Sequence, residues 1–180
     1  AILCRSGILA LVLAAPAYAD DASYDAAAIF AKAKAAYAQL QSYADKGTLV
    51  TEYHAEGPAI VEHYAFATAF RPPRQFIFDS EKASTGERYV IWADGGDFNT
   101  FWSATNVTDD YPQGQGDTAF AVSSGPTQEA TVTIAPLLFP QAELQGPLAN
   151  FGELTAEGFE AIDGHRCYRI GGTIAIAYGT

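Results

Sequence analysis

Short runs of aromatic and β-branched residues recur between positions 47 and 104, separated by residues that favour turns. The runs cover residues 47–55, 59–70, 74–80, 87–93 and 97–104. Gly or Pro stands between successive runs. Because Gly adopts turn conformations readily and Pro cannot donate to a strand ladder, each connection ends one strand and reverses the chain. The pattern predicts five consecutive antiparallel strands that form a meander.

Both faces of the predicted strands are apolar. Side chains alternate between the two faces of a strand, and in residues 59–70 one face carries mainly aromatic residues, whereas the other carries valine, histidine and alanine. A sheet that is apolar on both faces needs a covering layer on each side, or one layer and a bound ligand. A cavity lined by aromatic residues and an ordinary filled core are equally compatible with this pattern.

An amphipathic helix is predicted before the strands, over residues 23–44. Apolar residues at spacings of three and four lie along one side, with lysine and glutamine mostly on the other. Ser23 is placed to cap its start and Gly47 to end it. The helix has one apolar face to bury, and we expect it to pack on the meander.

A polar, Gly-rich connection over residues 105–117 follows the meander. Residues 127–139 are predicted to be helical in part, with Thr127 as the cap and Pro136 kinking or ending the helix. The Leu-Leu-Phe run at 137–139 suits a plug for the mouth or the interior of the sheet.

Strand signals return near the C-terminal end of the sequence. Residues 157–162 and 165–171 flank Asp163-Gly164, a strong hairpin signal. A further apolar run begins at residue 173. Because a final apolar strand would leave an open edge, we expect the sequence to be truncated at this end.

Residues 1–19 have the pattern of a secretory signal peptide. Arg5 precedes an apolar run over residues 8–15, and residues 17–19 form a small-x-small ending. The apolar run is too short to span a bilayer. We therefore predict export with cleavage after Ala19, and a mature chain without a transmembrane segment.

The mature chain is expected to be strongly acidic. The whole sequence has ten Lys and Arg against 21 Asp and Glu, and the first nineteen residues contain one Arg and no acid, so 9 − 21 gives a formal charge of −12. Nucleic acids and anionic membranes are disfavoured as partners, because their binding depends on Lys and Arg. Cys4 leaves with the signal peptide, so Cys167 has no partner for a disulfide within the mature chain. Pairing of Cys167 with another chain stays open.

Residues with catalytic or metal-binding chemistry are few. His54 and His63 fall on a predicted hairpin, but they do not lie opposite each other and zinc needs three or four ligands, so we interpret them as structural. His165 and Cys167 share one face of a strand, which would suit a Cys–His nucleophile, but no third group orients them. We predict a protein that is not an enzyme and has no metal or cofactor.

Two motifs carry a resemblance to a known family. The segment AFRPPRQFIF at 69–78 is followed by YVIWADGGDFNTFWS at 89–103. With a signal peptide and a first helix before these strands, the chain resembles the bacterial outer-membrane lipoprotein carrier superfamily (LolA/LolB-like) over residues 23–103. The additional residue in RPPRQF and the hairpin at 157–171 depart from the carrier's pattern, which indicates a separate branch of the superfamily.

The resemblance implies an unclosed antiparallel barrel in the periplasm, lidded by helices, whose apolar interior binds acyl chains without catalysis. We therefore expect an α+β fold, mostly β, in a single domain over residues 20–180. Its curled antiparallel sheet, a half-barrel, would be covered by the N-terminal helix and by a helical lid insert at 127–139. Arg71 matches the arginine that ties the lid to the barrel in the carrier. The alternative for Arg71 is a solvated arginine before a turn.

The expected ligand is the acyl chain of a lipid or lipoprotein, held in an aromatic-lined cavity. Apart from Arg71, the expected ligand-binding residues are large side chains of the strands and the insert, namely Tyr64, Phe66, Phe76, Phe78, Trp92, Trp102 and Leu138. The alternative function is a periplasmic protein-interaction or sensor domain with a filled barrel, which meets an envelope protein through its acidic surface or a sheet edge. A hydrolase that uses His165 and Cys167 is the third possibility.

Overall fold

The computed structural model describes residues 24–54, 57–139, 148, 151–162 and 164–174. Strands make up 50% of the structure and helices 22%, so the chain has the predicted α+β fold, mostly β. None of the described helices is long and apolar enough to span a membrane. The predicted signal peptide at 1–19 and most of the final strand predicted at 173–178 lie outside the described residues.

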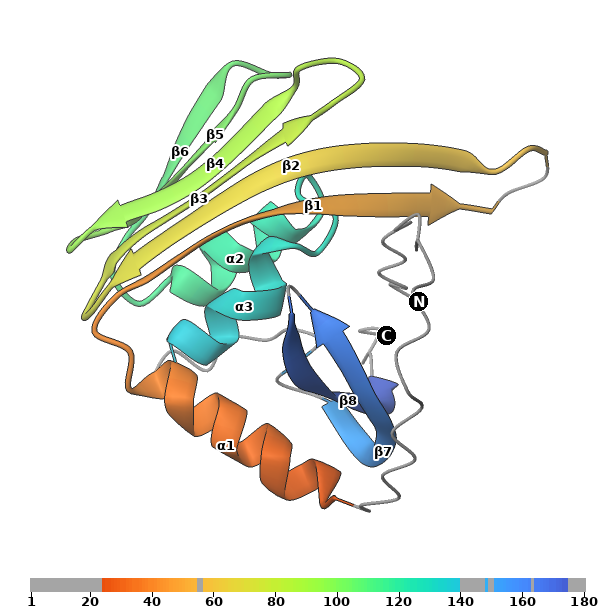
Figure 1. Ribbon diagram of the computed structural model, residues 1–180. Helices are drawn as coiled ribbons and strands as arrows, with labels where there is room; N and C mark the ends of the chain where they lie inside the picture. The colour runs from red at the N-terminus through yellow and green to blue at the C-terminus, as the bar shows by residue number, and fades with distance from the viewer. Residues whose placement is uncertain (1–23, 55–56, 140–147, 149–150, 163, 175–180) are drawn as a thin grey trace, which may run out of the picture.

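Six antiparallel strands form a curled sheet that does not close into a barrel (Figure 1). They follow one another in chain order: β1 (Tyr43–Tyr53), β2 (Ile60–Arg71), β3 (Gln75–Lys82), β4 (Arg88–Asp94), β5 (Phe98–Trp102) and β6 (Val107–Tyr111). The predicted meander of five strands is confirmed. The sixth strand was expected to be a connection, because its sequence is mostly polar. It is an edge strand, and acidic side chains on an edge oppose pairing with other chains.

The N-terminal helix, α1 (Ala26–Ala38), is shorter than predicted. Its cap is Asp25, whose carboxylate accepts a hydrogen bond from the Ala28 amide at 3.0 Å. The helix ends at Gln39, and the residues up to 44 that were assigned to it include the start of β1.

Gly47 lies within β1 and does not end the helix as predicted. It stands opposite Phe66 of β2, and a Cβ atom on Gly47 would lie only 2.4 Å from the Cζ atom of that ring. The glycine therefore makes room for an aromatic side chain on the neighbouring strand.

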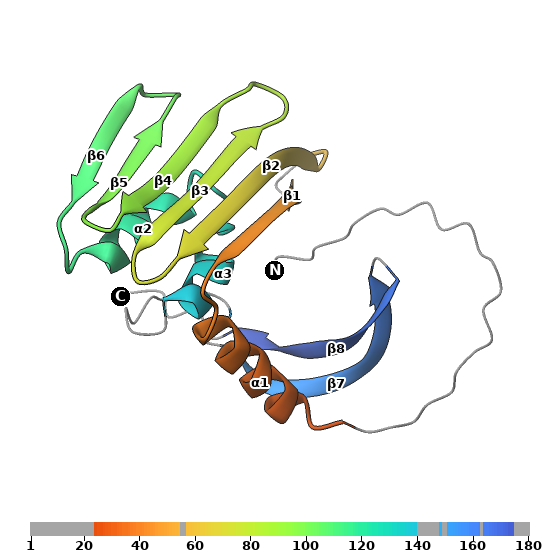
Figure 2. The same cartoon turned by 60° about the vertical axis from the view of Figure 1, so that its left-hand side comes forward.

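Two consecutive helices, α2 (Gly116–Ser124) and α3 (Thr131–Leu138), cover the concave face of the sheet (Figures 1 and 2). A helix within 127–139 is confirmed, with Pro136 inside it, whereas α2 was not predicted. Thr127 is not the cap of α3, which begins after Ala130. Instead the buried Thr127 hydroxyl donates to the Ser123 carbonyl at 2.7 Å and so ties the two helices together.

The core lies between these helices and one end of the concave face. It is dominated by phenylalanine rings from β2, β3, β5 and the helical insert, chiefly Phe70, Phe76, Phe98, Phe120 and Phe139. Their ring centroids lie 4.9 to 6.4 Å apart, mostly edge to face, which is the favoured arrangement of aromatic pairs.

The C-terminal hairpin consists of β7 (Phe151–Ile162) and β8 (His165–Ile174), and it forms a separate two-stranded sheet. The hairpin predicted around residues 163–164 is confirmed, with longer strands than expected. It packs on α1 and on the residues before it: Phe30 lies 5.6 Å from Phe151 and Tyr24 lies 5.4 Å from Phe159 between ring centroids. Figure 2 shows α1 beside this hairpin, whereas α2 and α3 lie against the larger sheet, so the cover expected from α1 is supplied mainly by the insert.

Candidate ligand-binding groove

A groove of about 780 Å³ occupies the other end of the concave face, beyond the part on which α2 and α3 pack directly. Its floor consists of side chains from β2 to β6, and its opposite wall consists of the end of α2 and the loop that leads to α3. The groove is therefore bounded by the same two layers that form the core.

Strand register brings the floor residues together. Tyr64 of β2 stands opposite Lys82 of β3, and Tyr89 of β4 stands opposite Trp102 of β5. Because residues two apart share a face, Tyr64 and Lys82 point to the same side as the core phenylalanines of their strands. The sheet thus places amphipathic side chains at one end of the face and apolar ones at the other.

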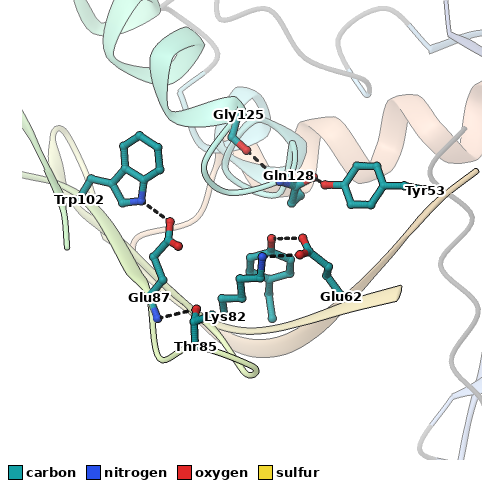
Figure 3. A network of polar contacts seen from close by, with 9 residues as sticks. Tyr53, Glu62, Lys82, Thr85, Glu87, Trp102, Gly125 and Gln128 are labelled. Carbon is teal, nitrogen blue, oxygen red and sulfur yellow. Dashed lines mark hydrogen bonds and ion pairs between the residues drawn. The ribbon is translucent and has the colours of Figure 1, made fainter. Parts of the chain in front are cut away.

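Glu62 holds the first polar cluster of the groove (Figure 3). Its carboxylate forms an ion pair with the Lys82 ammonium and accepts a hydrogen bond from the Tyr64 hydroxyl at 2.8 Å. The Lys82 ammonium also lies 5.9 Å from the centroid of the Tyr64 ring. Both members of the ion pair are only 21% exposed, so solvent screens the pair incompletely.

These contacts shift the pKa values in a consistent direction. The hydrogen bond from Lys82, and then that from Tyr64, lower the pKa of Glu62, and the bond to Glu62 raises the pKa of Lys82. Burial, followed by the bond to Glu62, raises the pKa of Tyr64. At neutral pH Glu62 and Lys82 are therefore charged and Tyr64 is neutral.

Trp102 and Glu87 form a second cluster. The indole Nε1 of Trp102 donates to Glu87 Oε1 at 2.6 Å (Figure 3). Tyr89 packs edge-on against Trp102, with ring centroids 6.4 Å apart, and its hydroxyl lies 3.1 Å from the Ser123 hydroxyl of α2. Burial raises the pKa of Tyr89, which keeps this hydroxyl protonated. Polar contacts thus fix both rings of the cluster.

Gln128 closes the mouth of the groove from the insert side. Its side chain accepts a hydrogen bond from the Tyr53 hydroxyl of β1 and donates to the Gly125 carbonyl at 3.2 Å (Figure 3). Gln128 and Glu129 both have left-handed backbone conformations, with φ of 53° and 66°. The loop between α2 and α3 is therefore sharply turned and tied to the β1–β2 hairpin.

The charged side chains that line the groove are Glu62, Lys82, Glu87 and Asp109. One cation against three carboxylates gives a formal charge of −2 for the lining. Anionic ligands are therefore disfavoured in the groove, and cationic or neutral ones are favoured.

Of the expected ligand-binding residues, two line the groove, four lie in or against the core, and Trp92 and Arg71 belong to neither. Tyr64 and Trp102 line the groove. Phe76, Phe78 and Leu138 are buried in the core, and Phe66 stacks on Phe78 with ring centroids 5.5 Å apart. The expected single cavity is therefore two adjoining regions, one filled and one open.

Trp92 is not on the concave face, contrary to expectation. It stands opposite Ile77, whereas its neighbour Ile91 is fully buried under the helices. Alternation along β4 sends the two side chains to opposite faces, and therefore Trp92 cannot reach the groove.

Arg71 is exposed at the end of β2. Within the described residues its side chain forms no hydrogen bond or ion pair with α2 or α3, so the contact expected of a lid latch is not formed there. Arg74, three residues further along the chain, is the arginine that lies near the insert. Its guanidinium stacks 4.8 Å from the centroid of the Phe98 ring, near Gly116 at the start of α2.

The residues with potential catalytic or metal chemistry lie apart from the groove. His54 is exposed and pairs with Glu52 at 3.3 Å, and the described residues contain no group of three potential ligands placed to hold a metal. Cys167 lies on the hairpin, where its thiol points to the His165 carbonyl at 3.7 Å and not to the imidazole. The described geometry provides no nucleophile–base pair at these positions.

Glu62, Lys82, Glu87, Tyr89 and Gln128 were not predicted as groove residues. Alternation along β2 places Glu62 on the same face as Tyr64, but its partner Lys82 comes from the neighbouring strand, and Glu87 and Gln128 come from loops. Strand register and loop contacts are needed to bring these partners together.

Comparison with family models, curated proteins and solved structures found no match. The resemblance to the lipoprotein carrier superfamily stays a prediction.

Proposed function

We propose that the protein is a non-catalytic binding protein of the periplasm that takes the acyl chain of a lipid or lipoprotein onto the concave face of its sheet. The observation that supports this function is that two short helices cover the apolar end of this face. The apolar end of this face lies under α2 and α3, which have nine and eight residues. Helices this short are stabilised by packing more than by their own hydrogen bonds, so a ligand that offers the same apolar contacts would compete directly with the cover.

The two helices of the insert are linked to each other. The Thr127 hydroxyl bonds to the Ser123 carbonyl and lies 2.9 Å from the Thr131 hydroxyl, which links the end of α2 to the start of α3. The side chains that the insert places against the sheet are apolar, chiefly Phe120, Leu138 and Phe139. An acyl chain is also apolar and flexible, so it would replace these contacts with similar ones.

Lipid mass spectrometry of the purified protein, followed by titration with a fluorescent fatty-acyl probe, tests this function. We expect bound acyl lipid, and tighter probe binding by Leu138→Ala, because Leu138 is 4% exposed and its truncation makes room at the closed end. Ile77→Ala, on the other face at 40% exposure, is the matched control and should bind the probe unchanged. Absence of both lipid and probe uptake would refute the function.

A sensor or protein-interaction domain is the second candidate, and the tip of the β1–β2 hairpin favours it. Tyr53, Ile60 and Val61 are exposed by 40%, 58% and 50%, and pairing of β2 with β3 begins only at Tyr64. Exposed apolar residues beside an unpaired strand edge suit a partner that adds a strand. Under this candidate the purified protein carries no lipid, and Val61→Lys weakens its complex with the partner while leaving the fold intact.

Export is part of the proposal and rests on the sequence pattern of residues 1–19. The intact mass of the protein from the periplasmic fraction measures it directly. We expect a chain that begins at Asp20, and an uncleaved cytoplasmic product would contradict the assignment.

A further inference from the structure

The groove contains two units of similar construction, each with an aromatic ring bonded to a carboxylate. In the first, the Tyr64 hydroxyl donates to Glu62. In the second, the Trp102 indole donates to Glu87 at 2.6 Å. Each carboxylate therefore lies at the edge of an aromatic ring, and the faces of such rings attract cations.

The first unit is occupied by a cation of the protein itself. The Lys82 ammonium binds Glu62 and lies 5.9 Å from the Tyr64 ring centroid. Among the described residues, no lysine or arginine forms an ion pair with Glu87 of the second unit or with Asp109, which also lines the groove. Arg88 is bonded to Asp79 instead, and Lys82, whose charge interacts with Glu87 over a longer distance, is paired with Glu62.

Two carboxylates of the groove, Glu87 and Asp109, have acceptor capacity left. Glu87 uses Oε1 for the Trp102 indole, and Asp109 lies on the groove side of β6, two strands from Tyr89. Tyr89 provides a second ring at 6.4 Å from Trp102. An ammonium group that carries alkyl groups fits such surroundings, because it combines positive charge with an apolar surface for the rings.

We propose that Trp102, Glu87, Tyr89 and Asp109 form a binding site for an alkylated ammonium group. The site would bind the polar head group of the ligand. Only the attachment of an acyl chain to that head group rests on the proposed function. The net charge of −2 on the lining favours a cation over the carboxylate or phosphate that an anionic lipid would present. A bare metal ion is a poorer fit, since no described group of three ligands is placed to hold one.

Tryptophan fluorescence gives a direct assay. The chain has two tryptophans, so Trp92→Phe, on the opposite face, leaves Trp102 as the sole reporter. Choline is titrated at constant ionic strength against its neutral isostere 3,3-dimethylbutan-1-ol. We expect a saturable change with choline at an affinity about tenfold higher than that of the isostere. Calorimetry on the unmodified chain supplies the same comparison if the variant does not fold.

Matched substitutions identify the site. Glu87→Gln keeps an acceptor for the Trp102 indole and should weaken choline binding about tenfold. Asp109→Asn should also weaken it, whereas Asp110→Asn makes the same charge change on the other face of β6 and should have no effect. Equal binding of choline and its isostere, an unchanged affinity in Glu87→Gln, or no saturable signal would each overturn the proposal.

Longer probes separate this proposal from the acyl-binding function. Dodecyltrimethylammonium and dodecanoate share one chain and differ in the sign of the head group. If both bind equally and choline does not, the cation site is refuted while acyl binding stands. If choline binds and neither chain improves on it, the cation site stands and acyl binding fails.

Discussion

The two ends of the concave face are made by the same strands but carry different chemistry. At the closed end, β2, β3 and β5 carry Phe70, Phe76 and Phe98. At the groove end, the same strands carry Tyr64, Lys82 and Trp102, each an even number of residues from the phenylalanine of its strand. The face is the same, because even spacing preserves it. The apolar end is covered by helices and the amphipathic end is left as a groove. The polarity gradient along each strand, and not the topology, decides where the cover ends.

Truncation at the closed end should have the largest effect on stability. Phe120 is 1% exposed and contacts Phe76, Phe98 and Phe139. We expect Phe120→Ala to lower the free energy of unfolding by about 3–5 kcal/mol, measured by urea denaturation.

The matched control for this truncation is Val122→Ala. Val122 lies on the same helix but faces the groove and is 44% exposed, so its loss should cost under about 1 kcal/mol. Equal losses for the two variants would mean that the ends are packed alike and that the comparison is wrong.

Exchanging the chemistry of the two ends should have the next largest effect. Phe76→Tyr adds a hydroxyl among phenylalanine rings at a position 4% exposed, and should destabilise the fold by about 1–3 kcal/mol. The reverse change, Tyr89→Phe, removes a hydroxyl that bonds to Ser123 and should cost about 1 kcal/mol. Thermal unfolding of both variants measures the difference. A neutral Phe76→Tyr would show that water or a polar partner reaches the closed end.

Acid titration probes the ion pair at the open end. The folded-state pKa of Glu62 lies below its ordinary value of 4.5, so the pair stabilises the fold fully above about pH 4.5 and loses this contribution as the pH falls through the lowered pKa. The pKa of Lys82 is raised above its ordinary value of 10.5, so at alkaline pH the pair is lost as the pH rises through this raised pKa. We expect the difference in unfolding free energy between the native protein and Glu62→Gln to be constant near neutral pH and to shrink on acidification.

A charge-matched control for the titration is Glu160→Gln, an exposed position of β7. The difference in unfolding free energy between Glu160→Gln and the native protein should not shrink on acidification in the same way. If the Glu62→Gln difference instead grew as the pH fell below 4.5, the pair would not be the source of the effect.

The smallest effect is expected at the mouth of the groove. Tyr53→Phe removes only the bond to Gln128 at a residue 40% exposed, and should change the unfolding free energy by under about 1 kcal/mol. Hydrogen exchange is the informative measurement, because the loop before α3 loses its tie to β1. The amides of residues 125–130 should exchange faster than in the native protein, while those of β4 stay unchanged.

The sequence was sufficient to predict the meander, the C-terminal hairpin and a helix within 127–139, because each has a strong local signal. The predictions failed where a local signal pointed to the wrong element. Gly47 was taken as a helix end, yet it lies within β1, where the ring of Phe66 on the next strand leaves no room for a side chain. The acidic β6 was taken as a loop, although pairing with β5 makes it a strand.

The groove was predictable only in part, for the same reason. Tyr64 and Trp102 follow from the aromatic pattern, but Glu62 interrupts that pattern and was not recognised as the partner of Lys82, twenty residues away. Register, which the sequence does not specify directly, also places Trp92 on the other face. Contacts between distant segments therefore set the chemistry of the site, whereas local patterns set its framework.

The buried helical side chains that cover the closed end come from one continuous segment, residues 116–139. Such a segment acts as a tethered competitor, whose effective concentration at the sheet is on the order of millimolar. A ligand that enters must displace this segment, so the apparent affinity of the ligand depends on the sequence of the insert as much as on that of the sheet. Substitutions in α2 and α3 would therefore change the ligand concentration needed for binding without changing the sheet residues that contact the bound ligand.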